Sequence, residues 1–212
     1  MLKINEIFFS IQGESTYAGL PTVFVRTSGC HLRCTYCDTT YAYTEGEKMS
    51  LPAILSVIKN YPTQYVCITG GEPLLQNEVY ALMTTLCDQG YFVSLETSGD
   101  ISCRNVDARV RKIIDVKTPD SGAAGAFCRE NLNLGDVNTE FKFVICSEND
   151  FLWAENFVRE YRLCEKHTVL YSPSFAKIEP RWLAEKILKE NSKARLQLQL
   201  HKYIWSPCTR GV

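Results

Sequence analysis

Seven short apolar segments recur along the chain, and most of them are followed by a helical pattern. This alternation limits the fold more than any other feature. The segments that read as β-strands are residues 22–27, 65–69, 92–97, 113–116, 140–145, 168–171 and 195–200. Helical spacing of apolar residues is found in residues 50–58, 79–86, 151–161 and 180–190. Strands that alternate with helices predict βα units and a parallel sheet.

The length of the chain narrows the choice among parallel folds. It has 212 residues, and no repeat or linker divides it, so we expect one domain over residues 1–212. A complete barrel of eight βα units takes about 250 residues. We therefore predict an incomplete, TIM-like βα barrel of the α/β class, with a doubly wound open sheet as the alternative.

Polar or glycine residues stand at the ends of the predicted strands. In βα barrels the chemistry lies at the C-terminal ends of the strands, so these residues are candidates for a site. They are Arg26 and Cys30, the run 69–72, the run 96–98, Asp115 and Lys117, Ser172, and Gln199 with His201.

Cys30, Cys34 and Cys37 form a C-x3-C-x2-C motif after the first of these strands. Cysteine thiolates are the usual ligands of iron–sulfur clusters, and three can hold three irons of a [4Fe–4S] cube. The fourth iron is then open to a small molecule, which indicates chemistry, because structural metal sites usually close their coordination sphere. The motif alone also permits a zinc site completed by another ligand such as His31.

The other seven cysteines are scattered and make no second metal motif. Cys67 and Cys146 lie in apolar strand-like runs, where a thiol is most often a small buried hydrophobic group. Cys208 is the exception that we single out, since the C-terminal tail could reach the active site.

The net charge and the hydropathy of the chain are those of an ordinary globular protein. The net charge of −1 gives no support for direct binding to a nucleic acid, so no nucleic-acid partner is expected. Lys3, Asn5 and Glu6 interrupt any apolar leader, and no stretch is apolar enough to span a bilayer, so no membrane contact is expected. We expect a cytoplasmic protein without a disulfide framework.

A second motif, Thr69-Gly70-Gly71-Glu72-Pro73, follows another apolar strand. Paired glycines let the backbone approach a ligand closely, and Pro73 favours an extended Glu72. By itself the motif is also typical of a tight turn. Together with the cysteine motif it resembles the GGE segment of radical S-adenosylmethionine (SAM) enzymes. That resemblance implies that the amino and carboxylate groups of SAM chelate the open iron of the cluster and that the glycine backbone binds the SAM ammonium group.

Further motifs are similar to those of the 7-carboxy-7-deazaguanine synthase family. They are residues 7–15, Gly19, Pro21, Phe24, Arg26, residues 37–39, residues 96–99 and residues 199–203. The resemblance implies a partial barrel of the radical SAM type and a lyase that converts 6-carboxy-5,6,7,8-tetrahydropterin to 7-carboxy-7-deazaguanine, with release of ammonia. The product would enter 7-deazapurine (queuosine) biosynthesis for tRNA modification. The implied cofactors are a [4Fe–4S] cluster, SAM and Mg²⁺. The implied partners are an electron donor, such as flavodoxin or ferredoxin, and a second copy in a homodimer.

The same resemblance assigns the site residues of this chain, none of them as a protein acid or base. Cys30, Cys34 and Cys37 hold the cluster, and Thr39 binds Mg²⁺. The substrate contacts are Ile11, Gln12, Gly13, Glu14, Arg26, Thr69, Glu96, Gln199 and His201. The SAM contacts are Gly71, Glu72, Asp115, Val116, Lys117, Ser172, Pro173, Ser174 and Phe175. Arg26 would form a charge-assisted pair with the substrate carboxylate, whereas alone it reads as a surface ion pair.

Two stretches depart from the pattern of the family. Many members have Ser-Pro-Lys in place of Asp115-Val116-Lys117, and Gln-Pro in place of Ser172-Pro173. The tail after His201 is the other departure, since it continues through Trp205, Pro207 and Cys208. Its apolar residues predict that residues 203–212 cover the substrate pocket or the dimer partner, and a frayed terminus is the alternative.

Two other functions compete with this one. A radical SAM activase that makes a glycyl radical on a partner protein shares the cysteine motif, but it has no need of Gln12, Arg26 or His201. A non-catalytic iron–sulfur or zinc protein has no reason to keep the segment 69–72 beside the cysteines.

Overall fold

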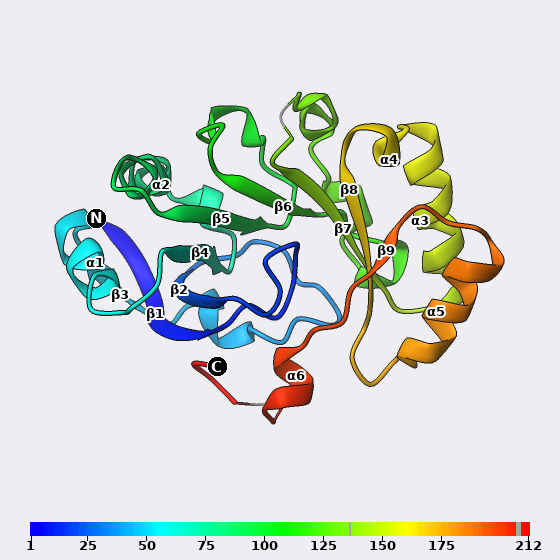
Figure 1. Ribbon diagram of the computed structural model, residues 1–212, viewed down its shortest axis with the longest axis horizontal. Helices are drawn as coiled ribbons and strands as arrows, with labels where there is room; N and C mark the ends of the chain where they lie inside the picture. The colour runs from blue at the N-terminus through cyan, green and yellow to red at the C-terminus, as the bar shows by residue number, and fades with distance from the viewer. Residues whose placement is uncertain (136, 207–208) are drawn as a thin grey trace.

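A computed structural model describes residues 1–135, 137–206 and 209–212, and within them a single curved sheet organises the molecule (Figure 1). Its nine strands stand in the order β3-β1-β2-β4-β5-β6-β7-β8-β9. They are β1 (Leu2–Ile11), β2 (Pro21–Thr27), β3 (Glu47–Met49), β4 (Tyr65–Gly70), β5 (Phe92–Thr97), β6 (Arg111–Asp115), β7 (Thr139–Ile145), β8 (Thr168–Pro173) and β9 (Arg195–Leu196). No helix in this part of the chain is long and apolar enough to cross a membrane.

The sheet is an incomplete parallel barrel, as predicted. β2 and β4 to β9 pair in parallel, while β1 pairs antiparallel with β2 and β3 with β1. Within the described residues, β3 and β9 stand at open edges and do not close the barrel. From β4 to β9 the strands follow chain order without a reversal, which excludes the doubly wound alternative.

Most helices cover the outer face of the curved sheet, and the last one lies apart from them beside the C-terminus (Figure 1). The α-helices are α1 (Leu51–Ile58), α2 (Glu78–Asp88), α3 (Glu148–Glu160), α4 (Leu163–Lys166), α5 (Pro180–Lys189) and α6 (His201–Ile204). Short 3-10 segments are η1 (Thr40–Tyr43), η2 (Pro73–Leu75), η3 (Cys103–Asn105), η4 (Pro119–Ser121), η5 (Ala124–Ala126) and η6 (Arg129–Asn133). In the described part of the β5–β6 and β6–β7 connections, such segments replace the α-helix of a regular βα unit.

Strand β7 shows how the sequence divides between the two faces of the sheet. Phe141 and Phe143 are fully buried in the main core, which also contains Phe151 of α3. Lys142 and Val144 alternate with them and line a cavity on the inner face. The side-chain period of two in a strand therefore separates the outer apolar core from the inner polar lumen.

The structure corrects the predicted elements at both ends of the chain. β1 and β3 are not among the predicted strands. In β1, buried Leu2 and Ile4 alternate with Lys3 and Asn5, but the alternation breaks at Glu6, where the pairing with β2 is irregular. The last predicted strand, 195–200, is a strand only at Arg195–Leu196.

The chain leaves the sheet after Leu196, and the NH of Leu200 donates to the carbonyl of Gly13 at 3.1 Å. His201 consequently begins the short helix α6 instead of ending a strand.

Candidate functional site

A cavity of about 580 Å³ opens at the C-terminal ends of the parallel strands. Most of the predicted site residues line it. They are all nine predicted substrate contacts, the three motif cysteines, Thr39, and the SAM candidates Gly71, Asp115, Lys117, Ser174 and Phe175. Residues from the first and last parts of the chain therefore meet around one space.

Four of the predicted SAM residues do not line the cavity: Glu72, Val116, Ser172 and Pro173. Val116 alternates with Asp115 and Lys117, so when those two face the cavity it belongs to the buried core. Side chains alternate between the two sides of an extended backbone, so consecutive residues of a family motif cannot all face one ligand.

Glu72 has protein partners for its whole carboxylate. It accepts hydrogen bonds from the NH of Leu74 at 3.0 Å, from the hydroxyl of Thr97 at 2.9 Å, and from the NH and hydroxyl of Ser98 at 2.7 and 2.6 Å. Burial raises the pKa of Glu72, and the Ser98 donors oppose that effect. Its side chain thus fixes the turn after β4 to the end of β5, and only the backbone of this segment is left to meet a ligand.

The glycines of the same turn lie against the cysteine loop. The NH of Gly71 donates to the carbonyl of Thr27 at 3.1 Å, and the NH of Glu72 donates to that of Gly29 at 2.7 Å. A Cβ at Gly71 would lie 2.1 Å from the Gly29 oxygen and 3.0 Å from the Cβ of Cys30. Glycine at this position is therefore a condition for the close approach of the two motifs.

The three motif cysteines are half-buried free thiols that face the same cavity. Burial raises the pKa of Cys30 and of Cys34, so in the absence of metal these thiols hold their protons. His31, the alternative zinc ligand, instead pairs with Asp100.

The chemistry of these donors suits an iron–sulfur cluster. Three thiols face one cavity, and in a [4Fe–4S] cube each thiolate binds a different iron, which leaves one iron open. In residues 1–135, 137–206 and 209–212, no three His, Cys, Asp or Glu side chains are grouped around one metal-ion position.

One group of polar side chains joins β4, β5 and the start of the β1–β2 loop. The hydroxyl of Thr69 donates to Glu96 at 3.0 Å, and the amide of Gln12 approaches the other Glu96 oxygen at 3.4 Å. All three residues line the cavity. Because the carboxylate can accept further hydrogen bonds, this group can recognise the N–H edge of a heterocycle.

The β1–β2 loop forms a floor beneath the barrel, which sequence reasoning did not foresee. Since β1 and β2 are antiparallel, residues 12–20 start from the N-terminal ends of the parallel strands. The NH of Thr16 donates to Glu140, near the start of β7, at 3.2 Å. We call residues 12–16 the floor segment.

Glu14 points from the floor segment into the lumen. Its oxygens accept hydrogen bonds from Lys142 at 2.6 Å and from the side-chain amide of Gln199 at 2.7 Å. Burial opposes ionisation, but Lys142 and Gln199 together lower the pKa of Glu14 below its usual value. The carboxylate is therefore charged and rigidly held.

Gly13 lies beside His201, and the short distance between them explains why residue 13 is a glycine. A Cβ at Gly13 would lie 2.2 Å from the His201 ring nitrogen Nδ1 and 3.1 Å from its backbone nitrogen. The segment around Gln199 and His201 can therefore cross the floor segment only where a side chain is missing.

Arg26 is mostly shielded from solvent and lines the cavity, which contradicts the surface-pair alternative. Only 15% of its side chain is exposed, and its Nε donates to Glu6 at 2.7 Å. The hydroxyl of Tyr41 donates to the same Glu6 oxygen at 3.0 Å. Burial disfavours the charged form, yet Tyr41 and Glu6 raise the pKa of Arg26, so a guanidinium faces the cavity.

Thr39 lies beside a charged pair that the sequence did not single out. Its hydroxyl donates to Asp38 at 2.9 Å, and Lys202 of α6 lies 2.6 Å from the other Asp38 oxygen. Burial would raise the pKa of Asp38, but Lys202 lowers it to about 2. The pair connects the cysteine loop to the C-terminal segment.

Residues 209–212 also line the cavity. The Arg210 guanidinium lies 3.7 Å from the centre of the Tyr41 ring, and its Nη1 lies 3.1 Å from Glu45. Figure 1 shows this end of the chain beside α6 and close to β1 and β2. Pro207 and Cys208, two of the residues on which the prediction for the tail rests, lie outside the described residues.

Comparison with known proteins agrees with this geometry. Residues 24–121 match the model of the radical SAM superfamily. The chain is 45% identical to a 7-carboxy-7-deazaguanine synthase of Chlorobaculum tepidum, over 100% of this chain and 97% of that protein. It is 42% identical to one of Koribacter versatilis, over the full length of both. The chain belongs to the 7-carboxy-7-deazaguanine synthase family.

The fold agrees with the same family. The crystal structure of QueE from Escherichia coli superimposes with a TM-score of 0.76 over 93% of each chain, at 23% identity. As a 7-carboxy-7-deazaguanine synthase, the protein is a radical SAM lyase of 7-deazapurine biosynthesis. Membership implies a [4Fe–4S] cluster and SAM, and neither the glycyl-radical activase nor the non-catalytic protein gains support.

Proposed function

We propose that this synthase contracts the ring of 6-carboxy-5,6,7,8-tetrahydropterin, with release of ammonia, above the floor segment. One observation carries the proposal: the cavity that holds the three motif cysteines is also lined by the floor side chains Gln12 and Glu14. A radical source and a polar cradle for a flat heterocycle thus share one space.

Cys30, Cys34 and Cys37 would hold the cluster, and Gly71, Asp115, Lys117, Ser174 and Phe175 are the SAM candidates that line the cavity. The cluster and SAM, when bound, supply the radical that starts the reaction. The protein then has to orient the substrate and exclude water and competing reactions.

The protein supplies that orientation through charge and hydrogen bonding. Arg26 is the group for the substrate carboxylate, since a guanidinium offers a planar pair of donors. Glu14 and Glu96 are acceptors for the N–H groups of the pterin ring, and Thr69 and Gln199 hold these carboxylates in place.

Several finer properties follow from the family and from local chemistry. Thr39 would contribute one oxygen ligand to Mg²⁺, an ion that keeps several waters and takes few protein ligands.

We place the homodimer in the cytoplasm, where the free thiols of the described cysteines stay reduced. Flavodoxin or ferredoxin would supply the electron, and the product would serve queuosine formation in tRNA.

Anaerobic turnover tests the proposal. The reconstituted protein is mixed with a reductant, SAM, Mg²⁺ and 6-carboxytetrahydropterin, and 7-carboxy-7-deazaguanine and ammonia are measured. Equal amounts of both products are expected, with a lower rate when Mg²⁺ is omitted. SAM cleavage without either product would show that the substrate is a different one.

A further inference from the structure

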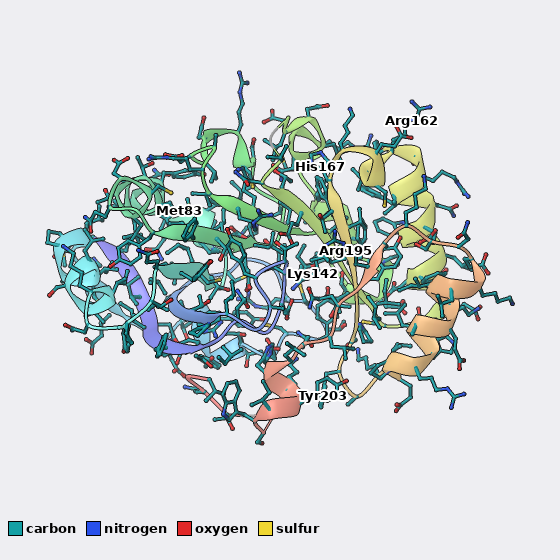
Figure 2. All side chains as sticks on the ribbon, in the orientation of Figure 1. Met83, Lys142, Arg162, His167, Arg195 and Tyr203 are labelled. Carbon is teal, nitrogen blue, oxygen red and sulfur yellow. The ribbon has the colours of Figure 1, made fainter. Side chains whose placement is uncertain are left out.

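Lys142 is a buried cation that no family motif in the sequence analysis includes. It lies on β7, inside the curve of the sheet, as Figure 2 shows. Its Nζ lies 2.6 Å from Glu14 of the floor segment and 3.8 Å from Asp115 at the end of β6. Only 10% of the side chain is exposed.

The two carboxylates that face Lys142 belong to different parts of the site. Glu14 is a substrate candidate, and Gln199 holds its other oxygen. Asp115 is a SAM candidate, and Lys117 holds its Oδ2 at 2.9 Å. One ammonium group thus lies between the substrate side and the cofactor side of the cavity.

One carboxylate oxygen of Asp115 has no partner among the described residues. Its Oδ1 is buried and has no hydrogen-bond partner in the part of the chain that the structure describes. Buried acceptors without a partner are rare in folded proteins, and Asp115 lines the cavity. Lys117 and Lys142 therefore fix the orientation of the Asp115 carboxylate through its Oδ2.

The electrostatics give Lys142 a fixed charge. A buried ion is unfavourable unless it is paired. Burial lowers the pKa of Lys142, but Glu14 and Asp115 outweigh burial and raise it above its usual value. A lysine that retains its proton is unsuited to proton transfer and suited to holding its neighbours in place.

We propose that Lys142 is a positioning residue. Through Glu14 it holds the substrate side of the cavity at a fixed position relative to the cofactor side, which it contacts through Asp115. The inference rests on the proposed function, because it takes Glu14 as a substrate contact. Without Lys142, Glu14 is a buried carboxylate held only by the amide of Gln199, so it takes up a proton or turns away. Asp115 keeps Lys117 and retains its orientation.

The test compares Lys142→Met, Glu14→Gln and the double variant with the wild-type holoenzyme. The substrate KM, the SAM Kd, and the ratio of 7-carboxy-7-deazaguanine to 5′-deoxyadenosine are measured. For Lys142→Met, losing the partner of a buried charge predicts a KM raised by about 10-fold or more, and a lower product ratio. The SAM Kd and the iron content stay within about twofold, since Lys117 still holds Asp115.

The double variant separates positioning from folding, because it leaves neither an unpaired Glu14 nor an unpaired Lys142. If both residues act through one pair, its KM stays close to that of the more impaired single variant. Lys112→Met is the matched control: Lys112 is a buried lysine on the neighbouring strand β6 that does not line the cavity. Its substrate KM is expected to be unchanged.

Two results would overturn the inference. One is a Lys142→Met enzyme whose KM and product ratio equal those of the wild type, while Glu14→Gln is impaired. The other is a double variant in which the two single effects multiply, as independent sites do. If Glu14→Gln itself leaves the KM unchanged, it is the proposed role of Glu14 that fails, and the two failures are thereby distinguished.

Discussion

At the scale of single residues, Arg26 shows how partners decide the role of a charged side chain. Glu6 engages its Nε, and no hydrogen bond to the two terminal nitrogens occurs among the described residues. The pair with Glu6 fixes the plane of the guanidinium, and that plane determines how a carboxylate can bind.

Replacement of Arg26 by Lys tests this role. The ammonium of lysine lacks the planar fork, so the apparent affinity for the pterin should fall by about 1–3 kcal/mol, the range for hydrogen bonds to charged groups. The SAM Kd should not change. Substrate titration and SAM titration of the same preparation check both statements, with Glu6→Gln as a companion that retains the guanidinium. An equal loss of SAM affinity would mean that Arg26 is structural.

Cys34 allows an equally direct prediction. Cys34→Ala leaves two motif thiolates, which should not retain a cube, so iron content, sulfide content and SAM cleavage should all be lost. Cys87→Ala is the control, since Cys87 is another half-buried free thiol, on α2. Iron and sulfide analysis after anaerobic reconstitution gives the answer, and a fully loaded Cys34→Ala protein would refute the ligand assignment.

At the scale of elements, the turn after β4 and the cysteine loop after β2 form one unit. Backbone hydrogen bonds join Gly71 to Thr27 and Glu72 to Gly29, and the Glu72 side chain ties the same turn to Ser98 after β5. Three neighbouring strand ends are therefore locked together beneath the cysteines. These backbone hydrogen bonds hold the start of the cysteine loop against the turn after β4.

Gly71→Ala should disturb that unit. The new methyl group would lie 2.1 Å from the Gly29 oxygen, so one of the two backbones must move. We expect weaker cluster retention and weaker SAM binding, with the thermal midpoint lowered by several degrees. Gly125→Ala is the control, because nothing lies within 4 Å of a Cβ at Gly125. Iron content, SAM titration and thermal unfolding are measured on both variants, and identical cluster loading and SAM affinity would argue against the coupling.

At the scale of the whole molecule, residues from near both ends of the chain line one cavity. The floor segment enters from one end of the barrel, while residues 209–212 line the cavity and Arg210 stacks on Tyr41. Enclosure of this kind protects a reactive intermediate from water. The tail should therefore affect how efficiently SAM cleavage is coupled to product.

Deletion of residues 206–212 tests the tail. The shortened enzyme should retain its cluster and cleave SAM, but it should form less product per 5′-deoxyadenosine and bind substrate more weakly. Arg210→Ala should give a smaller effect in the same direction, since it removes only the contact with Tyr41 and Glu45. The measurement is the amount of product formed per 5′-deoxyadenosine during anaerobic turnover. If the deletion leaves this ratio unchanged, the tail has no role in closing the cavity.

Much of the parallel sheet could be predicted from the sequence. The predicted strand 92–97 coincides with β5, and the motif cysteines meet the nine substrate candidates in one cavity. Local patterns are informative where a strand is buried on both faces. They did not reveal β1, with its interrupted pattern, or the early end of β9, which depends on a contact between Leu200 and Gly13. Lys142 was missed because its partner Glu14 lies 128 residues away in the sequence.

The floor segment has a consequence for how such enzymes diversify. The cysteine loop and the glycine turn belong to one rim of the barrel, whereas the floor segment is inserted through the opposite rim between two antiparallel strands. Mutations that lengthen this insertion or change its sequence would reshape the space beneath the substrate, while the backbone contacts between the cysteine loop and the glycine turn stay in place. New substrate ranges are therefore accessible through one short hairpin loop, while the three motif cysteines are retained.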